Sequence, residues 1–115
     1  MKRVRVAGVP YTIVFSDDIR TVSVDRTDNS TLLGQTDYLG RTIRLYKAPN
    51  RTEERGIVFL HELVHAIVEA YSIDKMVDDS GKHVEANIDR MAIGLYEALK
   101  SLGINITKTI DDVKK

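Results

Sequence analysis

Apolar and polar residues alternate along the first part of the chain. Apolar side chains occupy every second position over residues 4–6 and 11–15, which is the pattern of strands with one buried face. The segment Ala7-Gly8-Val9-Pro10 between them has the composition of a turn. We therefore predict a β-hairpin over residues 2–16.

A second alternating stretch extends over residues 32–46. It is clearest over residues 42–46, and residues 37–41 before it have turn composition, so a second hairpin is expected here. Between the two hairpins, residues 22–24 suggest a short extended piece, and residues 25–31 are polar enough to form a loop.

Beyond the second hairpin the apolar period changes from two to between three and four, which indicates helices. Asn50 or Thr52 can cap the first helix, and its apolar stripe comprises Ile57, Leu60, Val64, Ile67 and Tyr71. A polar connector over residues 72–82 leads to a second helix that begins near His83 and stops at Gly103, a residue suited to the left-handed C-terminal position. Its stripe comprises Ile88, Ala92, Leu95, Leu99 and Leu102. The remaining tail has no clear pattern.

These elements predict a single α+β domain over residues 1–115, with a small antiparallel or mixed N-terminal sheet packed on two long helices. The 17 basic and 17 acidic residues give a formal net charge of zero, so no overall field attracts nucleic acid or anionic lipid. No apolar run approaches the roughly 18 residues that a membrane span needs. We expect a cytoplasmic protein that binds neither nucleic acid nor membranes.

The first predicted helix contains the motif His61-Glu62-Leu63-Val64-His65. Histidines four residues apart project from the same face of a helix, so His61 and His65 can bind one metal ion. Glu62 points to the side of this pair, where a carboxylate can act as general base toward a water molecule. The chain has no cysteine, so a zinc site must be completed by histidine, carboxylate or water. Alternatively, the motif arises by chance in an ordinary helix.

The third ligand must come from a residue further along the chain. The candidates are Asp78, Asp79, His83, Glu85 and Asp89. Glu85 and Asp89 are one turn apart on the second helix, so we predict that Glu85 binds the ion and that Asp89 orients a histidine ligand by accepting its free ring N–H. In the alternative, Glu85 is an exposed acid at a helix N-terminus, His83 takes its place as ligand, and Asp89 pairs with a neighbouring basic residue.

The motif at residues 61–65, followed by Glu85-Ala86-Asn87-Ile88-Asp89, resembles the paired helices of gluzincin metallopeptidases. The likeness is closest to small ImmA/IrrE-like metallopeptidases of phages and mobile elements, and it covers residues 34–99. The resemblance implies a minimal zincin-like fold and zinc-dependent hydrolysis of peptide bonds. It also implies an edge strand at residues 41–47, beside the metal, along which an extended protein or peptide substrate binds.

Larger gluzincins supply a His or Tyr from beyond the glutamate helix to stabilise the developing oxyanion, and only Tyr96 and a short tail follow it here. The candidates to replace it are Tyr38, Tyr46, Tyr71 and His83, of which we retain Tyr71 and His83 as transition-state stabilisers. Tyr71 and Tyr96 at helical spacing more often pack in the core. The missing oxyanion-stabilising residue motivates a second hypothesis. In this hypothesis the chain is a metal-stabilised, non-catalytic protein-binding or regulatory module encoded by a phage or mobile element.

Overall fold

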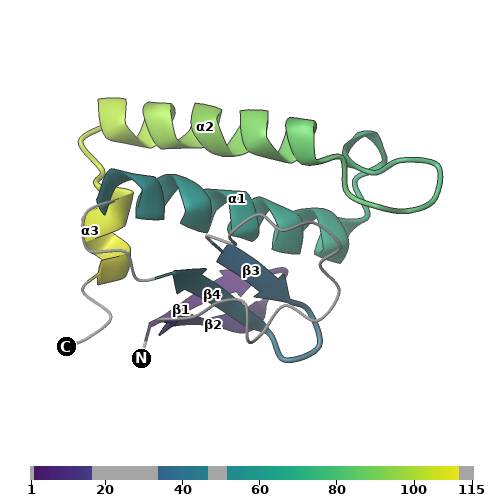
Figure 1. Ribbon diagram of the computed structural model, residues 1–115, viewed down its shortest axis with the longest axis horizontal. Coiled ribbons are helices and arrows are strands. Elements are labelled where there is room, and N and C mark those ends of the chain that lie inside the picture. Colours follow the sequence, from purple (N-terminus) through teal and green to yellow (C-terminus); the bar gives the residue numbers. More distant parts are fainter. Residues whose placement is uncertain (1, 17–33, 47–51, 112–115) are drawn as a thin grey trace.

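The computed structural model describes residues 2–16, 34–46 and 52–111 of the chain (Figure 1). The elements in chain order are β1 (Arg3–Val6), β2 (Val9–Ser16), β3 (Gly34–Asp37), β4 (Thr42–Tyr46), α1 (Thr52–Tyr71), the 3-10 helix η2 (Asp74–Met76), α2 (Glu85–Ser101) and α3 (Ile106–Asp111). The strands form one sheet in the order β1-β2-β4-β3, with a parallel β2–β4 pair between two antiparallel pairs. The expected α+β class and mixed sheet are confirmed. In the described ranges, no helix is long and apolar enough to cross a membrane.

Both predicted hairpins are present. β1 and β2 are joined through Ala7 and Gly8, whose φ angles of 52° and 77° are the positive values that a tight two-residue hairpin turn requires. In the second hairpin, the Asp37 carboxylate accepts a hydrogen bond of 2.9 Å from the Gly40 N–H and so closes the turn between β3 and β4. The extended piece and loop expected over residues 22–31 lie outside the described residues.

The prediction that residues 41–47 form the edge strand is wrong. β4 pairs with β2 on one side and with β3 on the other, so β3 is the edge strand at this end of the described sheet. Alternation identifies the two strands of a hairpin and their buried face, but both strands carry the same pattern. Which of them joins the rest of the sheet therefore depends on tertiary packing.

α1 lies between the sheet and α2 (Figure 1). On the sheet side, Phe59 and Leu60 of α1 belong to a buried cluster, and the strand residues in that cluster are Val6, Tyr11, Ile13, Ile43 and Leu45. On the other side, Ile88 of α2 packs with Val64 and Val68 in a second cluster. Burying an aliphatic side chain of this size stabilises a fold by about 1.5–3 kcal/mol. Packing on two opposite faces therefore fixes the position of α1 firmly.

The predicted apolar stripes are confirmed except at their C-terminal ends. Leu60, Val64, Ile88 and Ala92 are buried, whereas Tyr71 and Leu102 are 62% and 74% exposed. Both exposed residues lie at the C-terminal end of a helix. The second helix begins at Glu85, two residues after His83, and Gly103 follows its end with a φ of 84°, as expected.

α3, for which the sequence has no clear pattern, packs against the N-terminal end of α1 (Figure 1). Ile110 is buried in the sheet-side cluster, and the Thr107 hydroxyl accepts a hydrogen bond of 3.1 Å from the Gly56 N–H. A helix of six residues completes fewer than two turns, too few for an apolar period to be visible in the sequence.

Candidate metal centre

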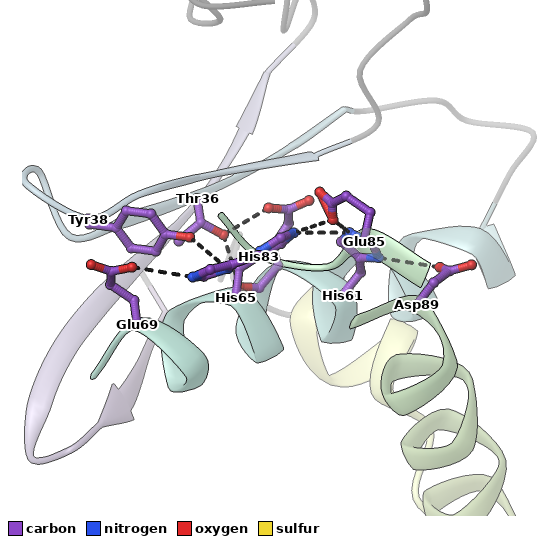
Figure 2. Close-up of polar contacts among 9 residues, drawn as sticks. Thr36, Tyr38, His61, His65, Glu69, His83, Glu85 and Asp89 are labelled. Carbon is purple, nitrogen blue, oxygen red and sulfur yellow. Dashed lines mark hydrogen bonds and ion pairs between the residues drawn. The ribbon is translucent and has the colours of Figure 1, made fainter. Parts of the chain in front are cut away.

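His61 and His65 lie one turn apart on α1 and point toward Glu85 at the start of α2 (Figure 2). The Nε2 atoms of the two histidines are 3.2 Å apart. Oε2 of Glu85 lies 3.4 Å from Nε2 of His61 and 2.9 Å from Nε2 of His65. In the part of the chain that the structure describes, these three residues alone form a cluster of histidines and acids close enough to share a metal ion.

The chemistry and spacing of these three atoms fit a metal ion. Zinc binds imidazole nitrogen and carboxylate oxygen at about 2.0–2.1 Å, and a tetrahedral arrangement then separates the ligand atoms by about 3.3 Å. The observed separations of 2.9, 3.2 and 3.4 Å lie close to this value. The group formed by His61, His65 and Glu85 could therefore hold a metal ion without rearrangement of the helices that carry it.

Glu85 was expected either to bind a metal ion or to be an exposed acid at a helix N-terminus, and its environment has features of both. Its side chain is 67% exposed at the N-terminus of α2, where the helix dipole favours a carboxylate. Its carboxylate nevertheless contacts both imidazoles, and hydrogen bonds from His61 and His65 lower the pKa of this carboxyl well below its usual value of 4.5. The same contact with Glu85 raises the pKa of His61 above 6.5.

Asp89, predicted to orient a histidine ligand, lies one turn after Glu85 on α2. Its Oδ1 is 3.3 Å from Nδ1 of His61 (Figure 2). A neutral His61 that binds a metal ion through Nε2 would carry its proton on Nδ1, where it can be donated to Asp89. Arg90, a basic neighbour that could have paired with Asp89, donates to Asn87 at 3.3 Å.

Glu62 is buried between α1 and the edge strand β3, with 8% of its surface exposed. Its Oε1 accepts a hydrogen bond of 2.8 Å from the Thr36 hydroxyl. Burial raises the pKa of the Glu62 carboxyl, and the two neighbouring imidazoles act in the opposite direction. Gly34 allows this close approach, because a Cβ there would lie 2.7 Å from Cγ1 of Val58 and 2.9 Å from Cγ of Glu62. The buried carboxyl group is therefore held beside the candidate metal site by contact with β3.

His83 lies next to His65 but contacts the opposite edge of its ring from Glu85. Nδ1 of His83 is 2.6 Å from Nδ1 of His65, and Nε2 of His83 is 3.3 Å from Oε1 of Glu69 (Figure 2). The Tyr38 hydroxyl is 3.4 Å from the same Nδ1, and burial, followed by the charge of Glu69, raises the pKa of this phenol. His83 therefore does not replace Glu85 in the cluster, and both of its ring nitrogens already have partners.

The other candidate residues are not part of the cluster. Tyr71 is 62% exposed at the end of α1, and its role as a transition-state stabiliser stays a prediction. Tyr96 packs against the sheet-side core, close to Gly56, as expected of an aromatic residue at helical spacing. Asp78 is occupied within its own loop, where Oδ1 accepts hydrogen bonds from Ser80 and from the Lys82 N–H.

Sequence reasoning missed two residues that support the site, Thr36 and Glu69. Glu69 follows His65 by four residues on α1, so helix spacing places it on the same face, and this signal was available in the sequence. Thr36 contacts Glu62 from a separate strand, 26 residues earlier in the chain. No local pattern connects such a pair.

Comparison of the chain with family models, with curated proteins and with solved structures finds no match. The resemblance to ImmA/IrrE-like gluzincins therefore stays a prediction based on the two motifs. The geometry of the cluster is independent of that resemblance, because it depends only on where α1 and α2 place His61, His65 and Glu85.

Proposed function

We propose that this chain is a zinc-dependent metallopeptidase. His61, His65 and Glu85 would hold the ion, and the observation that carries the proposal is the convergence of their three ligand atoms within 3.4 Å of one another. Two imidazoles and one carboxylate are a donor set that suits zinc in hydrolytic sites. When bound, zinc supplies Lewis acidity, which lowers the pKa of a water molecule and polarises a peptide carbonyl.

Glu62 acts as the general base. Burial raises the pKa of its carboxyl and so makes its carboxylate a stronger base than an exposed one. Glu62 removes a proton from the attacking water as the new C–O bond forms, and it donates this proton to the departing nitrogen as the C–N bond breaks. The Thr36 hydroxyl holds Oε1 of Glu62, which orients the other carboxylate oxygen for the proton transfers.

An extended peptide would bind along β3. This strand is the edge of the described sheet on the side of the site, and an unpaired edge offers backbone N–H and C=O groups to an added strand. Because Thr36 of β3 contacts Glu62, a peptide paired with this edge would run past the general base.

The test combines zinc content with cleavage. Protein purified without chelators should contain about one zinc per chain, and it should cleave members of a mixed peptide library, as read by mass spectrometry. Glu62→Gln should retain zinc and lose cleavage by about 100-fold or more, because general-base catalysis contributes roughly that much. Glu97→Gln, an exposed change on α2, is the control. Absence of stoichiometric zinc, or full activity in Glu62→Gln, would contradict the proposal.

A second candidate is a metal-stabilised module that binds a partner protein without cleaving it. What supports it is the environment of the two predicted oxyanion stabilisers: Tyr71 is largely exposed, and both ring nitrogens of His83 contact other side chains. Partner binding that is unchanged in Glu62→Gln, without cleavage by the wild-type protein, would favour this candidate.

A further inference from the structure

His65 has a second imidazole on the side of its ring that faces away from Glu85. Its Nδ1 lies 2.6 Å from Nδ1 of His83, and the two ring planes are only 14° apart. Two lone pairs would repel at this distance, and two N–H groups would clash. One proton must therefore lie between the two nitrogens, so that one ring donates a hydrogen bond to the other.

The direction of this hydrogen bond follows from the cluster. Nε2 of His65 faces Glu85, so a neutral His65 that binds a metal through Nε2 carries its proton on Nδ1. Nδ1 of His83 then accepts a hydrogen bond from the His65 Nδ1–H, and a neutral His83 carries its own proton on Nε2. That nitrogen lies 3.3 Å from the Glu69 carboxylate, which can only accept (Figure 2). In both hydrogen bonds that link His65 to Glu69 through His83, a donor thus faces an acceptor.

We propose that His83 and Glu69 are positioning residues of the metal centre, which fix the tautomer and the ring orientation of His65. A histidine ligand that donates its second N–H to an acceptor binds metal more tightly, because the acceptor fixes the ring and raises its basicity. His61 obtains this support directly from the Asp89 carboxylate, whereas His65 obtains it through one additional imidazole. The inference rests on the proposed metal site but not on hydrolysis.

The backbone before α2 holds His83 in place. His83 forms an isolated β-bridge with Val77, and the Val84 N–H donates a hydrogen bond of 2.8 Å to the Met76 carbonyl. The connector between the two ligand-bearing helices therefore has a defined position and presents the imidazole to His65. This placement explains why a histidine two residues before Glu85 contacts the site without joining its three ligand atoms.

Zinc affinity, measured by competition with a chromophoric chelator at fixed pH, tests the inference. His83→Leu removes the acceptor and should weaken zinc binding by about 10- to 100-fold. His83→Asn should restore most of the affinity, because Oδ1 of asparagine lies close to the position of the histidine Nδ1 and accepts the same hydrogen bond. Glu97→Gln should bind zinc like the wild type.

The contribution of Glu69 is measured by a double-mutant cycle. Glu69→Gln should weaken zinc binding by about 2- to 10-fold when His83 is present. It should have no effect in His83→Asn, because asparagine is too short to reach residue 69. The cycle gives a result even if His83→Leu does not fold.

Two outcomes would overturn the inference: equal zinc affinity in His83→Leu and the wild type, or no recovery in His83→Asn. A lack of coupling between residues 83 and 69 would overturn the part assigned to Glu69. Zinc affinities as expected together with no cleavage by the wild type would contradict only the proposed hydrolysis. Cleavage together with equal affinities in all variants would contradict only the positioning roles.

Discussion

Gly34 sets how closely β3 approaches α1 at Glu62. In Gly34→Ala the added methyl group would meet the side chains of Val58 and Glu62 at less than 3 Å, so these side chains or the strand must shift. Overpacking of this kind costs about 1–3 kcal/mol, and we expect a lower urea midpoint of unfolding. The matched control is Gly94→Ala on α2, where a Cβ has nothing within 4 Å and should stabilise the helix by about 0.5–1 kcal/mol. Equal midpoints for the two variants would contradict this view of Gly34.

The contact between His61 and Glu85 makes the stability of the metal-free protein depend on pH. The raised pKa of His61 contributes stability that is complete below pH 6.5 and is lost as the pH rises through that raised pKa. The lowered pKa of Glu85 contributes stability that is complete above pH 4.5 and is lost as the pH falls through that lowered pKa. The pair therefore stabilises the metal-free fold most between these two values.

Glu85→Gln tests this dependence in chelator-treated protein. The variant should lower the free energy of unfolding at about pH 5.5, below the raised pKa of His61, and should lower it less at about pH 8.5, because the imidazole loses its proton as the pH rises through that pKa. Urea unfolding at the two pH values measures the difference. A larger effect at the higher pH would show that the ion pair does not form.

At the scale of elements, α3 is attached to α1 by an ion pair as well as by its apolar residues. Nε and Nη2 of Arg55 contact the two carboxylate oxygens of Asp111 at 3.1 and 2.6 Å, and the arginine side chain is 13% exposed. Asp111→Asn removes the charge and one strong acceptor. We expect a loss of about 1–2 kcal/mol in the free energy of unfolding, moderated by the exposure of the aspartate. Asp79→Asn, an exposed loop change, should leave stability unchanged, and equal loss in both variants would contradict the assignment.

At the scale of the whole molecule, the candidate metal site is formed by residues of two separate helices. His61 and His65 belong to α1 and Glu85 to α2, so an ion bound to all three stabilises only the folded arrangement. Zinc at 100 times its dissociation constant should raise the free energy of unfolding by about 2.7 kcal/mol, and His65→Ala should abolish the effect. Because zinc binds neutral imidazole, the stabilisation should grow as the pH rises through the raised pKa of His61. Thermal unfolding with and without zinc at several pH values measures it.

Periodicity in the sequence was enough to predict both hairpins, the two amphipathic helices and the mixed α+β class. Spacing along the second helix, which places Glu85 and Asp89 on one face, also led to Glu85 as the expected third ligand, and the structure brings its carboxylate to His61 and His65. The hairpins and the helices each follow from a pattern within one stretch of the chain, so local chemistry is enough to predict them. The contact of Glu85 with His61 and His65, by contrast, forms only when the two helices meet.

Three features were decided only by the tertiary structure. β3, and not β4, became the edge strand because the order of strands depends on which hairpin strand meets β2. α3 could not be predicted from the sequence because contacts with α1 hold this short helix in place. The support of His65 by His83 and of Glu62 by Thr36 likewise required separate elements to meet. In each case the partners are distant in sequence, and no periodic pattern records a contact that forms only when the chain folds.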